Sequence, residues 1–185
     1  MRPPDRLAAG PLVLRRWTMA DADTLSAAVL DSVHHLRPWM PWAAEEPIDL
    51  AARHALLAAW DEAWEAGTEH AYGMWTDGTV VGSCGLHART KPNGLEIGYW
   101  VHAGHLRRGY ATAAAAGLAS AALEHARVDF VEIRHDKANV PSGRVPAALG
   151  FTRIGEEARP REAPAETGVS VLWRMRRETW LARDR

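Results

Sequence analysis

The stretch LEIGYWVHAGHLRRGYATAAAAGLASAALEHA, residues 95–126, decides the fold of this 185-residue chain. Its first part, within 94–103, alternates apolar and polar residues as a β-strand does. Its last part is mainly alanine and leucine, which predicts a helix. Arg107, Arg108 and Gly109 lie at the junction. A strand, a cationic glycine turn and a helix start, whose amide groups are free and whose dipole is positive, together predict an anion site, most naturally for a phosphate.

The composition is that of one ordinary globular domain, which we expect to span residues 1–185. Apolar residues make up 47% of the chain, charged residues 24%, and the net charge is −1. This balance argues against a nucleic-acid binder. The first residues form no apolar leader, and no apolar run has the length of a membrane span. We therefore expect a cytoplasmic protein that contacts neither nucleic acid nor a membrane.

The rest of the chain predicts a mixed α/β (α+β) fold around one sheet flanked by about four helices. Short residue patterns mark the ends of several elements. They are Thr18 with Asp21 as a capping box, Asp49 as a helix cap, Gly67 as a helix stop and Asp77-Gly78 as a hairpin turn. The expected helices are 18–33, 48–67, the alanine-rich segment and 142–150. The expected strands are 12–17, two within 70–88, 94–103, 128–136, 151–158 and 169–177, with a loop at 159–167.

Two motifs in this order resemble the acetyl-CoA site of the GNAT N-acetyltransferase superfamily. They are LEIGYWVHAGHLRRGYAT (95–112) and NVPSGRVPAALGF (139–151). HLRPWMPW (35–42) is similar to the branch of RimJ/RimL-type ribosomal-protein N-terminal acetyltransferases. The resemblance runs over about residues 10–177. It departs from the superfamily's turn at Leu106, where glutamine or arginine is usual.

The resemblance implies a central, mostly antiparallel, twisted sheet with a splayed pair of parallel strands. Backbone amides from about Arg108 to Thr112 would hold the CoA pyrophosphate, and the pantetheine arm would lie in the splay and bond the backbone of Trp100 and Val101. It implies acetyl-CoA as cosubstrate. No HxxxH pattern with a third ligand is present among the histidines, so we expect no metal site. The implied CoA-binding residues are Trp100, Val101, Arg107, Arg108, Gly109, Tyr110, Ala111, Thr112, Asn139 and Ser142.

Acetyl transfer to an amine needs a base that takes the amine proton. Glu96 is the first candidate, because it lies on the expected strand next to the thioester region, and the alternative is a solvent-facing glutamate. Leu95, Ile97 and Tyr99 would face the other side of that strand. His135 is a second candidate together with Asp136, since both end the neighbouring strand; the alternative for His135 is a structural hydrogen bond.

The departing thiolate is often protonated in similar proteins by a tyrosine seven residues after the position of Asn139. Here that position holds Pro146, so the usual acid is absent. Ser142 lies where the RimJ/RimL branch commonly has serine. It would hydrogen-bond the sulfur, cap the short helix at 142–150, or do both.

The segment HLRPWMPWAAEE (35–46) suits an amine acceptor. Trp39 and Trp42 lie three residues apart in a loop stiffened by proline, with Glu45 and Glu46 just beyond. Aromatic rings beside carboxylates favour a cationic group. The alternative is that the tryptophans pack in the core and the acidic turn is merely solvated.

These observations predict an acetyl-CoA-dependent N-acetyltransferase that acts on a primary amine, for example a protein N-terminus, by direct transfer in a ternary complex. Cys84 has no evident activating partner, so an acyl-enzyme is not expected. Two alternatives remain: a small-molecule acceptor such as an antibiotic, amino acid or polyamine, and a CoA-binding regulatory module without catalysis. Similar proteins are commonly dimers, so a homodimer is also expected.

Overall fold

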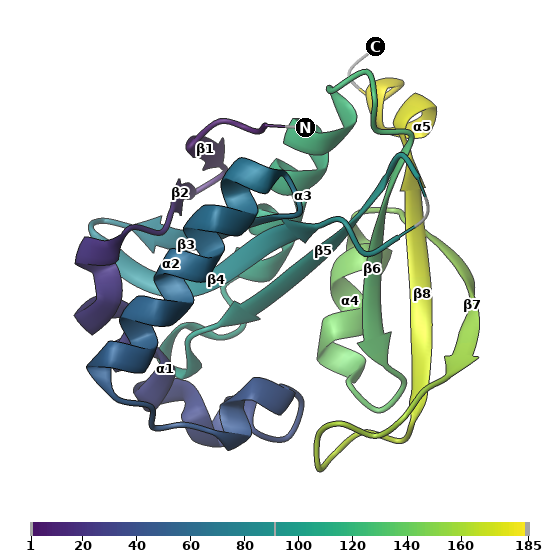
Figure 1. Ribbon diagram of the computed structural model, residues 1–185. Helices are drawn as coiled ribbons and strands as arrows, with labels where there is room; N and C mark the ends of the chain where they lie inside the picture. Colours follow the sequence, from purple (N-terminus) through teal and green to yellow (C-terminus); the bar gives the residue numbers. More distant parts are fainter. Residues whose placement is uncertain (1, 91, 184–185) are drawn as a thin grey trace.

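The computed structural model describes residues 2–90 and 92–183, and the backbone over that part of the chain forms one sheet with helices on both faces (Figure 1). Its strands are β1 (Arg6–Ala9), β2 (Leu12–Arg16), β3 (Glu69–Thr76), β4 (Thr79–His87), β5 (Gly94–Val101), β6 (Phe130–Asp136), β7 (Thr152–Ala158) and β8 (Val169–Arg176). The order in the sheet is β1-β2-β3-β4-β5-β6-β8-β7. Only β5 and β6 are parallel among these neighbours. The predicted fold class is confirmed.

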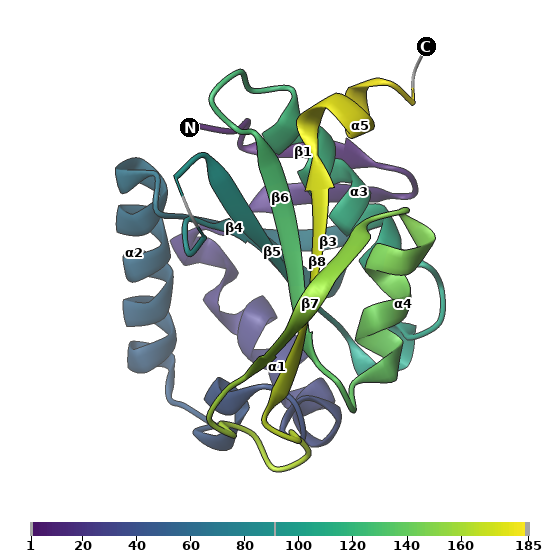
Figure 2. The ribbon, with the colours of Figure 1, turned by 90° about the vertical axis from the view of Figure 1, so that its right-hand side faces the viewer.

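The helices divide between the two faces of the sheet (Figure 2). They are α1 (Ala22–Leu36), α2 (Leu50–Ala66), α3 (Tyr110–Leu123), α4 (Val140–Ala148) and α5 (Arg177–Leu181), with short 3-10 turns η1 (Met19–Asp21), η2 (Pro41–Ala44) and η3 (Ala103–His105). α1 and α2 cover β3 and β4 from one side, whereas α3 and α4 pack on the other. No helix among the described residues is long and apolar enough to cross a membrane.

α3 is buried because nearly all of its sides meet protein. It contacts β1, β2, β4, β5, β6, α4 and α5. A helix surrounded in this way must be apolar all round and narrow. Alanine supplies both properties, and six of its residues are completely inaccessible: Ala114, Ala115, Leu118, Ala119, Ala122 and Leu123. The alanine-rich run is therefore explained by packing, which fixes the start of α3 beside the end of β5.

The local signals in the sequence mark real boundaries. Thr18 donates from its amide and its hydroxyl to Asp21 Oδ2, at 2.8 and 2.7 Å. Asp49 accepts from the amide of Ala52 at 2.8 Å and caps α2. Gly67 ends that helix in the left-handed region with φ 72°. Asp77 and Gly78 form the β3–β4 turn. These predictions are confirmed.

The sequence did not predict two short elements, β1 and α5. β1 pairs antiparallel with β2 across a turn at Gly10, although the sequence predicted one strand there. Its sequence RLAA has little β-propensity, so its stability comes from pairing and from α3. The expected strand 169–177 ends one residue early, because Arg177 begins α5.

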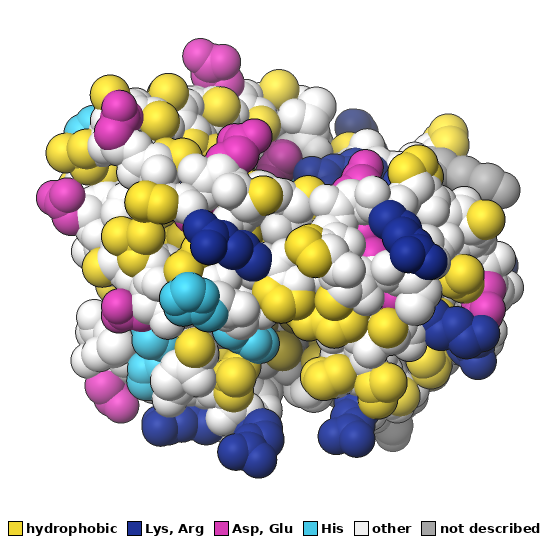
Figure 3. Space-filling model, turned by 90° about the horizontal axis from the view of Figure 1, so that it is seen from below, with side chains coloured by type: hydrophobic (Ala, Val, Ile, Leu, Met, Phe, Trp, Pro, Cys, Tyr) yellow, Lys and Arg dark blue, Asp and Glu magenta, His cyan; other side chains and the backbone are white. Residues whose placement is uncertain are grey.

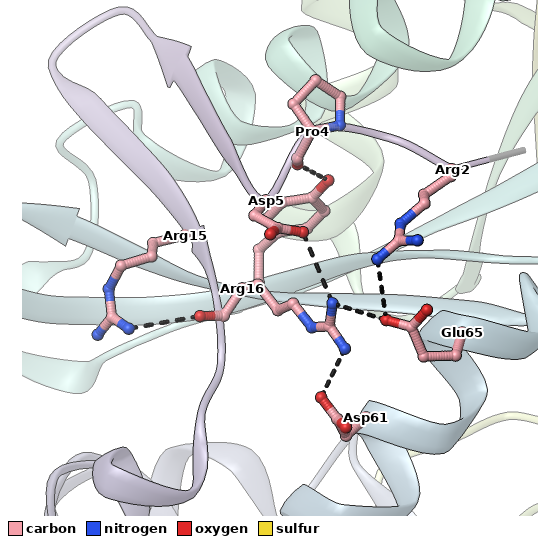
Figure 4. A network of polar contacts seen from close by, with 8 residues as sticks. Arg2, Pro4, Asp5, Arg15, Arg16, Asp61 and Glu65 are labelled. Atoms are coloured by element: carbon pink, nitrogen blue, oxygen red, sulfur yellow. Dashed lines mark hydrogen bonds and ion pairs between the residues drawn. The ribbon is translucent and has the colours of Figure 1, made fainter.

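An ion-pair network fastens the N-terminal segment to β2 and α2 (Figure 4). The Arg16 guanidinium contacts the carboxylates of Asp5, Asp61 and Glu65, and Arg2 also reaches Glu65. The acidic partners are half or more exposed, so each pair contributes at most about 1 kcal/mol. The network positions these elements more than it stabilises the fold.

The parallel pair separates soon after it forms. β5 and β6 are paired at three positions, Gly94↔Phe130, Leu95↔Val131 and Glu96↔Glu132. β4 pairs with β5 up to Val101, and β8 pairs with β6 up to Asp136. The carboxyl halves of β5 and β6 therefore belong to two diverging parts of the sheet with a gap between them, as predicted from the resemblance.

Candidate active site

A cleft of about 890 Å³ lies on the α1 and α2 side of the sheet and reaches this gap. Its lining includes η2, α2, β4, β5, the end of β6 and the β7–β8 loop. Figure 3 views the molecule from below, and hydrophobic side chains gather around a hollow near the middle of that face. The cleft brings together residues that are far apart in the sequence: Trp39, Trp42, Glu45, Tyr99, Asn139 and Ser142.

The turn before α3 has the geometry of an anion cradle. Gly109 caps the helix with φ 78°, and Arg107 also has a positive φ of 60°. The first helical bond runs from the amide of Ala113 to the carbonyl of Gly109 at 2.9 Å, so the amides of residues 110–112 point out of the helix end. A Cβ built on Gly109 meets nothing within 4 Å. Open space, free amides and exposed arginines suit the pyrophosphate of CoA.

The edge of β5 offers backbone groups to an extended ligand. The amide of His102 bonds the carbonyl of Val81 at 2.9 Å, and the ladder with β4 is regular from Glu96 to Val101. The backbone groups of successive strand residues point to opposite edges of the strand. Trp100 therefore turns its N–H and C=O toward β4, while Tyr99 and Val101 turn theirs toward the gap. Of the predicted pair, we therefore expect Val101 to bond the pantetheine arm.

Ser142 does not cap α4, contrary to one sequence-based expectation. Asn139 is the cap, since its Oδ1 accepts from the amide of Ser142 at 3.3 Å. The Ser142 hydroxyl instead lies 3.2 Å from the hydroxyl of Tyr99, which also donates to the Ser142 carbonyl at 3.0 Å. The serine hydroxyl is thus held at the gap between β5 and α4.

Tyr99 is the functional candidate that the sequence reasoning missed. Pro146, where similar proteins carry their tyrosine, is buried inside α4, and a tyrosine reaches α4 from β5 instead. The signal was present, because the alternation of β5 was predicted to turn Tyr99 to the side opposite Glu96. Burial raises the pKa of Tyr99 to about 12, so this hydroxyl keeps its proton at neutral pH.

Glu96 is paired with a cation and is not part of the cleft lining, although its neighbours Arg134 and His87 are. Its Oε2 is 3.5 Å from Nε of Arg134, whose Nη1 also pairs with Glu157. The cleft lining includes Ile97 and Gly98 but not Glu96. A catalytic role for Glu96 stays a prediction.

His135 is engaged through both ring nitrogens. Nε2 lies 3.1 Å from the indole nitrogen of Trp173, which only donates, so Nε2 accepts and Nδ1 carries the hydrogen. Nδ1 then donates to the Asp136 carbonyl at 2.8 Å. Burial opposes ionisation of Asp136, but hydrogen bonds from Ala138, Thr167 and Gly168 outweigh it and lower its pKa. These contacts fit structural roles, and catalysis by His135 stays a prediction.

The two glutamates of the segment 35–46, which we call the acceptor loop, lie in different environments. Trp39, Trp42 and Glu45 line the cleft, and the Trp42 ring is 6.3 Å from that of Trp100. The Glu46 carboxylate was predicted to lie beside the acceptor amine or, alternatively, on a solvated turn. It is instead 3% exposed and accepts from Arg53 at 2.8 and 2.9 Å. Glu45 is thus the exposed carboxylate of this pair.

Cys84 lies inside β4 and is buried. Burial raises its pKa, which keeps the thiol protonated and unreactive. This agrees with direct transfer and gives no support to an acyl-enzyme.

Comparison with known proteins defines the class of this chain. Residues 11–152 match the family described as "Acetyltransferase (GNAT) domain". "Putative ribosomal N-acetyltransferase YdaF" of Bacillus subtilis (strain 168) is 25% identical over 146 residues, which are 78% of this chain and 80% of that protein.

Solved structures agree with the fold. RimL, the ribosomal L7/L12 alpha-N-protein acetyltransferase in complex with coenzyme A, has a TM-score of 0.86 at 15% identity, covering 94% of this chain and 99% of that one. Mycobacterium smegmatis RimJ in complex with CoA-disulfide has a TM-score of 0.82 at 25% identity, covering 100% and 98%.

The sheet, its splayed parallel pair and the glycine turn define an acyl-CoA-dependent acetyltransferase fold. The chain belongs to the GNAT acetyltransferase family. It is an N-acetyltransferase, and acetyl-CoA is its acetyl donor.

Proposed function

We propose that the acceptor is the α-amine of a polypeptide and that the acetyl group passes to it directly in a ternary complex. The observation that carries this proposal is the cleft itself. It meets the gap from the α1 and α2 side, and its wall combines tryptophan rings with the exposed Glu45. Aromatic rings and a carboxylate attract an ammonium group before it loses its proton. The names of the relatives, which include ribosomal-protein acetyltransferases, point the same way.

In this proposal the CoA pyrophosphate binds the amides from about Arg108 to Thr112, with Arg107 and Arg108 as counter-charges, and the pantetheine arm follows the free edge of β5. Tyr110, Ala111 and Asn139 complete the CoA contacts. We also propose that the chain is a single domain over residues 1–185, that it works in the cytoplasm and that it forms a homodimer. Sedimentation of the purified protein tests the last point.

Tyr99 and Ser142 are proposed to stabilise the departing thiolate. Tyr99 is a weak acid, because a pKa of about 12 lies roughly 3.5 units above that of an ordinary thiol. Full proton transfer to sulfur would cost on the order of 5 kcal/mol. The pair therefore acts by hydrogen bonding, and water supplies the proton.

The variants Tyr99→Phe and Ser142→Ala test this pair. Each should lower kcat by about 10-fold, because each removes a hydrogen bond to a charged atom worth ~1.5 kcal/mol. The two hydroxyls lie 3.2 Å apart, so the double variant should lose less than the product of the single losses. Steady-state kinetics at saturating acetyl-CoA provide the measurement. Strict multiplicativity would show that the hydroxyls act separately.

Trp42→Ala tests the acceptor site. Trp42 is 39% exposed and lines the cleft, so its loss should raise the acceptor KM by about 10-fold and leave the acetyl-CoA KM nearly unchanged. Trp180→Ala is the matched control, because Trp180 lies on α5 and bonds Ser120. Equal changes in both KM values for Trp42→Ala would make Trp42 a packing residue.

A direct comparison of acceptors tests the proposed function. CoA release would be measured with peptides that begin with a free serine or alanine, with the same peptides blocked at the α-amine, and with an aminoglycoside and a polyamine. The proposal expects the highest kcat/KM for a free peptide N-terminus. Preference for the aminoglycoside or the polyamine would assign a small-molecule acceptor.

A further inference from the structure

A histidine also lies on the floor of the cleft. His87 is the last residue of β4, and its ring lies over two glycines, Gly85 on its own strand and Gly98 on β5. A Cβ at Gly98 would lie 3.0 Å from Nε2 of His87, and one at Gly85 would lie 3.4 Å away. Glycine at both positions leaves the space that the imidazole fills.

A carboxylate on the next strand lies beside this ring. Glu69 on β3 is the cross-strand partner of His87, and its Oε1 lies 3.4 Å from Nδ1. The contact with His87, followed by burial that acts the other way, leaves the pKa of Glu69 below its ordinary value. The ionised carboxylate favours hydrogen on Nδ1 and leaves the Nε2 lone pair for a substrate.

Nε2 of His87 lies near the gap between β5 and β6. β5 is paired with β6 up to Glu96, so Gly98 lies on the part of β5 that is free of β6. Nε2 thus sits on the cleft side of the gap, and Tyr99 and Ser142 lie at the same gap toward α4. His87, Gly98 and Tyr99 all line the cleft, whereas Glu96 does not.

We propose that His87 is the general base for the acceptor amine and that Glu69 is its positioning residue. This rests on the proposed function, since the substrate is the amine that enters the cleft. An ammonium N–H bond breaks and an Nε2–H bond forms. The neutral amine attacks the thioester carbon, the C–N bond forms and the C–S bond breaks. The amide nitrogen loses its second proton to the thiolate through water, and His87 returns its proton to solvent.

The charges around the ring set the pH dependence. Charged groups from each neighbouring element lie near the ring: Glu69 on β3 with its partner Arg89 on the loop after β4, and the cross-strand neighbour Glu96 on β5 with its partner Arg134 on β6. If His87 is the base, the acidic limb of the kcat/KM profile belongs to this imidazole. Removing the Glu69 carboxylate should move that limb to lower pH, because the imidazolium loses its nearest partner.

The test is the pH profile of kcat/KM with a peptide that begins with a free serine. At neutral pH, His87→Gln should lower kcat/KM on the order of 100-fold. The loss should shrink above about pH 8, where a free α-amine is already largely neutral. Glu69→Gln should keep the limb but shift it to lower pH. His34→Gln is the control, since His34 is exposed on α1, and should match the parent.

Stabilisation by CoA in each variant reports folding independently of the chemistry, and His87→Asn provides a second substitution. Activity of the parent chain on the peptide bears on the proposed function alone. An acidic limb that survives unchanged in both His87 variants would overturn the role of His87. If the limb disappears in Glu96→Gln instead, the base is Glu96.

Discussion

Gly109→Glu is expected to weaken the binding of CoA by roughly 100-fold while the protein stays folded. The glutamate side chain would enter the open space over the start of α3, where a Cβ meets nothing within 4 Å. Its charge would lie among the free amides that are proposed to hold the pyrophosphate. Like charges brought together cost several kcal/mol, and about 3 kcal/mol corresponds to roughly 100-fold in Kd.

Thermal unfolding with and without CoA measures this loss. At a CoA concentration about 100 times the parent Kd, the ligand adds about 2.7 kcal/mol of stability. A roughly 100-fold weaker site leaves only about 0.4 kcal/mol under the same conditions.

Gly78→Glu is the matched control. Gly78 has φ 76°, close to the 78° of Gly109, and its Cβ would also meet nothing within 4 Å. It therefore carries the same backbone strain and the same charge, but it lies in the β3–β4 turn away from α3. Stabilisation by CoA should persist in Gly78→Glu. Full stabilisation in Gly109→Glu as well would remove the glycine turn from the CoA site.

Arg53→Met is expected to cause the largest loss of stability. Arg53 and Glu46 are 2% and 3% exposed and form two hydrogen bonds with each other. Nε of Arg53 also donates to Ser26 on α1 at 3.0 Å. Methionine fills similar space, but it leaves the Glu46 carboxylate buried without its partner. Breaking a buried pair from one side costs about 3–5 kcal/mol.

Urea unfolding measures this free energy, with two comparisons. The double variant Glu46→Gln/Arg53→Met should be more stable than Arg53→Met, since no uncompensated charge remains. Arg2→Met breaks an exposed pair with Glu65 and should cost at most about 1 kcal/mol. A loss in Arg53→Met no larger than that of Arg2→Met would show that the pair does not hold the acceptor loop against α2.

Features that depend on neighbouring residues could be predicted from the sequence. The Thr18–Asp21 box, the Asp49 cap and the glycine at the end of α2 each act within one turn of backbone, so the residue types alone indicate them. The turn before α3 belongs to this group, because strand, glycine and helix follow one another along the chain.

The contacts that assemble the site are set by strand pairing and could not be predicted in this way. Tyr99 meets Ser142 across 43 positions in the sequence. Glu69 faces His87 only because β3 and β4 pair in that register. A helix cap was one of the two roles predicted for Ser142, but Asn139 takes that role and leaves the Ser142 hydroxyl free for Tyr99. A sequence pattern gives the faces of a strand but not its neighbours.

Mass spectrometry of the acceptor shows directly whether the protein acetylates the α-amine of a polypeptide. The protein would be incubated with acetyl-CoA and a peptide that has a free N-terminal serine and one internal lysine, and the product would be fragmented to locate the acetyl group. We expect one acetyl group per peptide, on the α-amine, with CoA released in equal amount. CoA release that is no faster with peptide than without it, and a peptide of unchanged mass, would contradict acetylation of a polypeptide α-amine.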